Sequence, residues 1–143
     1  MKHALALLAL LAGCATAPQP AIEPAGAPAP APAARVESIA VASLLDSARS
    51  DTEAGQLASA AASLERAIRI EPRNPRLWHE LARVRLKQGD YAQTESVAAR
   101  SNSWAGGDNA LRAENWRLIA RAREARGDAA GARAALDAAE RQR

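Results

Sequence analysis

Apolar and polar residues follow the three-to-four-residue period of amphipathic helices along most of the chain. From about residue 37 onward, this period is broken only by short segments containing Gly, Asp, Asn or Pro. Six helices are predicted, close to residues 37–53, 56–70, 75–88, 91–101, 109–126 and 129–141. The chain has no Phe, one Tyr and three Trp, so its core must be built from Ala, Leu, Ile and Val. Ala packs well between helices, whereas strands prefer β-branched and aromatic residues, so we predict an all-α domain.

The predicted helices form three pairs that share one sequence period. The turn glycines Gly55 and Gly89 lie 34 residues apart, and Gly89 and Gly127 lie 38 apart. We place the four additional residues in an insertion around residues 103–107. Each turn glycine is expected to adopt a left-handed conformation that ends the first helix of its pair. Pro75 is expected in the first turn of the next helix.

These positions resemble the tetratricopeptide repeat (TPR), a helix hairpin with a small residue at its eighth position and Gly at its fifteenth. The second repeat carries the pattern best, through Trp78, Leu81, Ala82, Gly89 and Tyr91. It departs from the pattern at Thr94 and Ser101 and lacks the closing proline, so an irregular end is expected for helix 91–101. The resemblance covers about residues 39–140 and implies three hairpins stacked as a short right-handed solenoid.

The N-terminus has the pattern of a bacterial lipoprotein signal. Lys2 precedes an apolar run at residues 4–11 that is too short to span a bilayer. The run ends in Leu11-Ala12-Gly13-Cys14, which matches a lipobox, and Cys14 is the only cysteine. We predict cleavage before Cys14 and acylation of its thiol with chains such as palmitate; a secretory signal with an incidental cysteine is the alternative. Ala15, rather than Asp, favours the outer membrane by resemblance to known lipoproteins.

Three segments are therefore predicted: a signal peptide at 1–13, a lipidated cysteine and tether at 14–35, and a TPR domain at 36–143. Residues 15–34 are nearly all Ala and Pro. Repeated proline favours extended polyproline II, so twenty residues reach roughly 60 Å at about 3.1 Å per residue. A tether that folds on a partner is the alternative. The last predicted helix ends close to Arg143, so we expect its own polar residues to cap the stack.

Charge and composition exclude several classes of function. The formal charge of +3 is too balanced to indicate nucleic-acid binding. Outside the signal peptide, His79 is the only histidine. The segment Gly106-Gly107-Asp108 lacks the strand and the Lys-Ser/Thr of a phosphate loop, so we expect it to end a helix, with Asp108 capping the next. Because metal-ligand clusters are also absent, we expect neither an enzyme nor a metal or cofactor beyond the lipid on Cys14.

TPR domains bind partners through a groove lined by set positions of the first helix of each hairpin. The resemblance places six cationic or imidazole side chains there: Arg49, Arg76, His79, Arg83, Arg117 and Arg121. Guanidinium groups suit the carboxylates of an acidic partner segment. The alternative is that these arginines form solvated helix faces, paired with Glu80, Glu114 and Glu124. Arg replaces the Asn and Lys of the family's carboxylate clamp, so a chaperone-type activity is not implied.

The three tryptophans fall into two groups. Trp78 and Trp116 occupy the fourth position of their repeats, where packing is expected. Trp104 lies in the predicted insertion, where the repeat requires no aromatic residue. For Trp104, two interpretations are open: packing between the second and third repeats, and an exposed contact with a partner.

The overall layout and the segment from Ser101 to Ala120 resemble small TPR-type outer-membrane lipoproteins that activate bifunctional class A penicillin-binding proteins. This resemblance implies a periplasm-facing protein whose partner is a peptidoglycan synthase. A TPR lipoprotein that assists type IV pilus or secretin assembly is the main alternative, although such proteins usually carry about twice as many repeats. A generic envelope scaffold is the third.

Overall fold

The computed structural model describes the backbone of residues 32–143 and the side chains from residue 38 onward. Its elements are α1 (Pro32–Glu53), α2 (Leu57–Ile70), α3 (Pro75–Lys87), α4 (Tyr91–Trp104), α5 (Asn109–Ala125) and α6 (Ala129–Glu140). No strand occurs among these residues, and the predicted all-α class is confirmed. The signal peptide, Cys14 and the tether up to residue 31 lie outside the described residues. α1 begins at Pro32, five residues before the predicted start of the first helix and inside the predicted tether 14–35, so that tether boundary is wrong.

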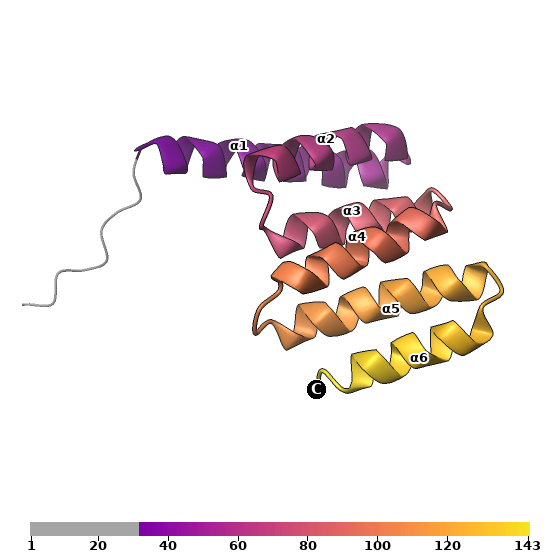
Figure 1. The fold of residues 1–143 in the computed structure, drawn as a ribbon. Coiled ribbons are helices and arrows are strands. Elements are labelled where there is room, and N and C mark those ends of the chain that lie inside the picture. Colours follow the sequence, from indigo (N-terminus) through magenta and orange to yellow (C-terminus); the bar gives the residue numbers. More distant parts are fainter. Residues whose placement is uncertain (1–31) are drawn as a thin grey trace, which may run out of the picture.

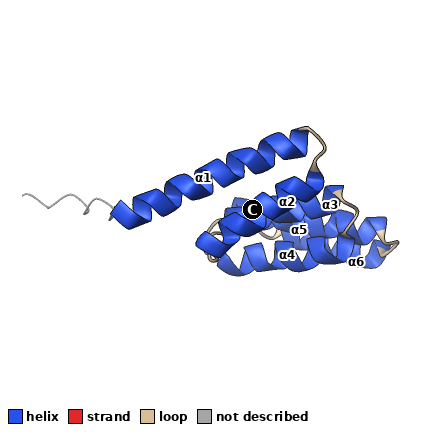
Figure 2. Ribbon diagram, turned by 90° about the horizontal axis from the view of Figure 1, so that it is seen from above, coloured by secondary structure: helices blue, strands red, loops and turns tan. Residues whose placement is uncertain are grey.

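The helices pack as three hairpins that follow one another in chain order. α1 packs on α2, α3 on α4, and α5 on α6; α2–α3, α4–α5 and α3–α5 contacts join the hairpins. Figure 1 shows the resulting stack, with the C-terminus at the end opposite α1. In the view of Figure 2, the N-terminal part of α1 extends past the other helices.

Small residues at the eighth position of each repeat bring the helices close together. Ala48, Ala82 and Ala120 are 2%, 0% and 3% exposed. Larger apolar side chains, such as Leu64 and Leu77, fill the core between them. Close helix packing built on alanine thus compensates for the scarcity of aromatic residues.

The turns within the hairpins have the predicted backbone conformation. Gly55, Gly89 and Gly127 have φ values of 75°, 78° and 82°, in the left-handed region that glycine adopts without a Cβ clash. Asp108 caps α5, as predicted, because its carboxylate accepts a hydrogen bond of 3.0 Å from the backbone N–H of Leu111.

Two details of the second repeat differ from the sequence prediction. α4 continues as a regular helix to Trp104, so the irregular end predicted near residue 101 is wrong. The insertion was also misplaced. α2 and α4 have 14 residues each and are followed by equally short loops, whereas α5 has 17 residues and α3 has 13. The four additional residues therefore form an extra first turn of α5, which buries Leu111 at 5% exposure.

Candidate protein-binding groove

A groove runs along the face formed by α1, α3 and α5, and its far end lies between α5 and α6. It consists of three cavities of about 260, 250 and 490 Å³, here called the first, middle and last cavity. Arg83 lines both the first and the middle cavity, and Arg117 and Arg121 line both the middle and the last. Because neighbouring cavities share walls, one extended ligand could contact all three.

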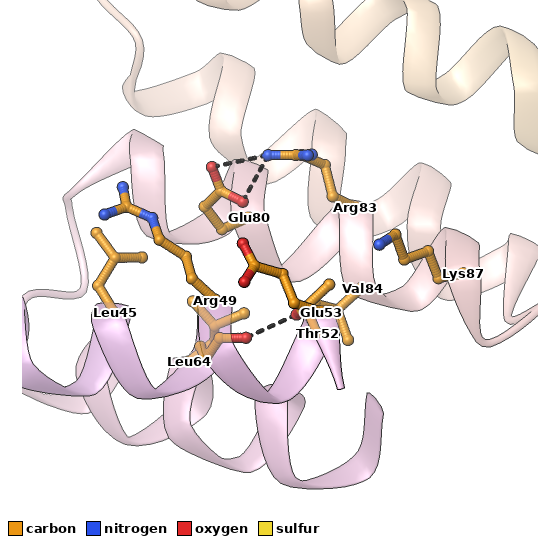
Figure 3. A pocket seen from close by; sticks show the side chains of 10 residues that line it. Leu45, Arg49, Thr52, Glu53, Leu64, Glu80, Arg83, Val84 and Lys87 are labelled. Atoms are coloured by element: carbon orange, nitrogen blue, oxygen red, sulfur yellow. Dashed lines mark hydrogen bonds and ion pairs between the residues drawn. The ribbon is translucent and has the colours of Figure 1, made fainter. Parts of the chain in front are cut away.

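The first cavity lies between α1 and α3. In Figure 3, Arg49 and Glu53 from α1 face Glu80 and Arg83 from α3. Arg83 donates to both carboxylate oxygens of Glu80, at 3.0 and 3.2 Å, and Arg49 pairs with Asp46 at 3.3 Å outside the cavity. Exposed pairs of this kind contribute little to stability, so a partner's carboxylate can compete for both guanidinium groups.

The middle cavity has a histidine among its lining residues. The side chain of His79 is 11% exposed, and its Nε2 lies 3.6 Å from a carboxylate oxygen of Glu114. Its Nδ1 lies 2.8 Å from Oδ1 of Asn115, which is fully buried. His79 therefore has one nitrogen in the protein interior and the other toward the groove.

Asn115 connects this histidine to α4 and to the start of α3. Its Nδ2 donates to Oγ of Ser101 at 2.8 Å and to Oδ1 of Asn102 at 2.9 Å. The Ser101 hydroxyl in turn donates to the carbonyl oxygen of Pro75 at 2.8 Å. We call this connected set, His79, Asn115, Ser101, Asn102 and Pro75, the polar junction.

The structure brings five of the six predicted groove residues together. Arg49, His79, Arg83, Arg117 and Arg121 line the three cavities. Arg76 lines none of them; its exposed guanidinium lies 3.4 Å from Asp108, in the loop before α5.

The predicted pairing with glutamates holds for only part of the groove. Arg83 pairs with Glu80, but Glu114 lies beside His79. Among residues 38–143, Arg117 and Arg121 have no ion-pair partner within 4.0 Å. The middle and last cavities thus have cationic groups available for a ligand.

None of the three tryptophans lines the cavities of the groove. Trp104 is 39% exposed, and the guanidinium of Arg73 lies 5.3 Å from its ring centroid. It ends α4, where Ile70 ends α2, so it does not belong to the insertion. The sequence allows two interpretations of Trp104, packing between repeats and exposure to a partner, and the structure agrees with exposure. Trp78 is partly buried, packs on the core and donates through Nε1 to the Pro72 carbonyl at 2.8 Å.

Sequence reasoning did not identify the polar junction. Asn115 occupies the third position of its repeat, where the second repeat has the buried Leu77. Ser101 occupies a position where the other repeats have Ala67 and Ala139. Comparison of the repeats could have identified Ser101, because both other repeats have alanine there, but not Asn115 as clearly, because the first repeat has the polar Ser43 at that position.

The groove carries hydrogen-bonding and charged side chains. Its lining offers guanidinium donors, carboxylate acceptors and one imidazole. Within the described part of the chain, no three His, Cys, Asp or Glu side chains are grouped to hold a metal ion. None of the described helices is long and apolar enough to cross a membrane.

Fold and groove together define a tetratricopeptide-repeat protein. The family model described as tetratricopeptide repeat matches residues 51–114. A search of curated proteins found no significant match. Among solved structures, the globular C-terminal domain of LpoP from P. aeruginosa is 53% identical, with a TM-score of 0.69. The match covers 70% of this chain and 94% of that domain. The chain therefore belongs to the LpoP family of tetratricopeptide-repeat proteins, and the resemblance predicted from the sequence is confirmed.

Proposed function

We propose that this chain is a lipid-anchored, periplasm-facing protein that binds and activates a bifunctional class A penicillin-binding protein. The observation that carries the proposal is the 53% identity over nearly the whole LpoP domain. It agrees with the independent resemblance of the layout and of the segment 101–120 to lipoprotein activators of such synthases.

The groove supports a binding role for the domain. Its three adjacent cavities involve all three hairpins, and the cations Arg117 and Arg121 are available for a partner. The proposed function needs neither catalytic groups nor a cofactor in this chain, because the synthase performs the chemistry. The chain acts through contacts that favour the active state of the synthase.

Membrane attachment is proposed to depend on Cys14 alone. The lipobox predicts acylation there, and each buried methylene of an acyl chain contributes about 0.8 kcal/mol to membrane binding. The Ala/Pro-rich segment then holds the domain away from the bilayer, with the outer membrane as the proposed location.

Replacing the cysteine tests this attachment. The Cys14→Ser variant should lose incorporation of labelled palmitate and move from the membrane to the soluble fraction of cells. The neighbouring Ala15→Ser variant, which leaves the thiol in place, should remain acylated. A Cys14→Ser chain that stays in the membrane fraction would contradict the proposal.

Binding to the synthase tests the proposed partner. Purified residues 15–143, which lack the lipid site, should form a complex with the cognate class A synthase in a surface-binding or calorimetric assay. The LpoP domain forms a globular structure as a domain, so this soluble chain is a suitable probe. Absence of any complex at micromolar concentrations would refute the proposal.

A further inference from the structure

The polar junction connects the protein interior to the groove through a chain of directed hydrogen bonds. It begins at the Pro75 carbonyl in α3, passes through Ser101 in α4 and Asn115 in α5, and returns to His79 in α3. All three side chains in this path are buried. Because each group has fixed numbers of donors and acceptors, the direction of every bond can be derived from one end.

The carbonyl of Pro75 fixes the first bond, since a carbonyl oxygen only accepts. Two oxygens 2.8 Å apart need a hydrogen between them, so the Ser101 hydroxyl donates its only hydrogen to Pro75. Ser101 Oγ must then accept from its other neighbour, which places the NH₂ group of Asn115 toward it at 2.8 Å. The second hydrogen of this NH₂ group goes to Asn102 Oδ1.

The orientation of the Asn115 amide fixes the tautomer of the histidine. Oδ1 of Asn115 faces Nδ1 of His79 at 2.8 Å, and an amide oxygen only accepts. Nδ1 must therefore carry the hydrogen. In the neutral ring, Nε2 is then left with its lone pair, on the side where His79 lines the middle cavity.

We propose that Nε2 of His79 is a hydrogen-bond acceptor site in the groove, which receives a neutral N–H donor from an extended acidic segment of the partner. The proposal rests on the proposed function for the identity of that partner. A carboxylate is disfavoured at this point, because Nε2 and the adjacent Glu114 both present lone pairs.

The charges around the middle cavity indicate which other chemical groups the ligand should carry. Arg83, Arg117 and Arg121 also line it, so a cationic donor would be repelled and a backbone or side-chain amide N–H is favoured. The same arginines can bind acidic side chains that flank this N–H. The partner segment is thus expected to place a backbone amide on His79 and carboxylates on the guanidinium groups.

The tautomer can be measured directly on residues 15–143, purified without a histidine tag. His79 is the only histidine in that chain, so its imidazole nitrogens are assigned without ambiguity. Long-range ¹H–¹⁵N spectra at mildly alkaline pH should show a protonated Nδ1 and an unprotonated Nε2. A protonated Nε2 would overturn the proposal, because it would require the reverse amide orientation and a donor toward Glu114.

One variant removes the acceptor at position 79 while keeping the hydrogen bond to Asn115. His79→Asn keeps a short amide donor for Asn115 but removes the acceptor in the groove. It should melt cooperatively, as the unsubstituted chain does, and bind the cognate class A synthase roughly three- to tenfold more weakly. Unchanged affinity in a folded variant would overturn the proposal.

The two measurements distinguish this inference from the proposed function. If the unsubstituted chain does not bind the synthase, the proposed function fails, while the ring-nitrogen shifts still confirm or refute the acceptor at Nε2. If binding is present and the tautomer is reversed, only the acceptor site is wrong.

Discussion

At the residue scale, the junction between the second and third hairpins depends on polar side chains. Asn115 is fully buried and uses its amide for hydrogen bonds to α3 and α4. A buried polar group costs free energy unless it is paired, whereas a paired one fixes the relative position of the helices it joins. Loss of Asn115 leaves Nδ1 of His79 without its acceptor and Oγ of Ser101 without its donor, although Ser101 keeps its bond to Pro75.

The Asn115→Leu variant tests this role. It should lower the free energy of unfolding by about 3 kcal/mol, because one substitution removes three side-chain hydrogen bonds and leaves Nδ1 of His79 unpaired. Urea unfolding followed by circular dichroism measures the change. The exposed Asn109→Ala variant on the same helix should change stability by less than about 0.5 kcal/mol. A loss for Asn115→Leu as small as that of the control would contradict this role.

Individual site residues could be predicted only where their position within the repeat shows which face of the helix they occupy. The register placed Arg83 and Arg117 on the groove face correctly, because every helix position has a fixed direction within a TPR. It could not show that His79 is buried, since that depends on Asn115, 36 residues away in the sequence. It also placed Arg76 in the groove, whereas the carboxylate of Asp108 holds its guanidinium near the α4–α5 loop.

At the element scale, helices and turns follow the sequence closely. The glycine spacing and the small eighth-position residues predict five of the six helices to within about two residues at their C-terminal ends. The exception is α4, which continues to Trp104 because the four additional residues extend the start of α5 and not the region around residues 103–107. An insertion in a repeat can extend a loop or a helix, and sequence spacing alone does not distinguish these outcomes.

The adjacent glycines of the α4–α5 loop provide a matched test of this turn. Gly106 has φ of 53°, whereas Gly107 lies outside the left-handed region, and a Cβ would meet open space at both. Gly106→Ala should cost about 1 kcal/mol because of its backbone conformation. Gly107→Ala should be neutral or stabilising by up to about 1 kcal/mol, through lower entropy of the unfolded chain.

Thermal unfolding of both variants measures the difference between them. A shift of 1 kcal/mol corresponds to about 4–8 °C in Tm for a domain of this size. Equal Tm values for the two variants would contradict the conformation described for this loop.

At the scale of the whole molecule, three hairpins create a binding face that no single hairpin has. Each cavity is lined by residues from two or more helices, and the shared arginines show that neighbouring cavities are adjacent. Electrostatic attraction by such a face accelerates association with an acidic segment and weakens as salt rises.

A double charge reversal tests whether this face is the interface. Arg117→Glu with Arg121→Glu should weaken binding to the synthase by about tenfold or more, since both side chains line two cavities. The matched control is Arg66→Glu with Arg69→Glu on α2, which makes the same charge change on residues that line a different pocket. Equal losses in the two double variants would place the interface outside the groove.

Stimulation of the synthase is the most direct test of the central claim. The rate of glycan-strand polymerisation by the purified cognate class A penicillin-binding protein should be measured with increasing amounts of residues 15–143. The rate is expected to rise and saturate at a concentration that matches the measured Kd. An unchanged rate at saturating concentrations would contradict the activator function, even if a complex forms.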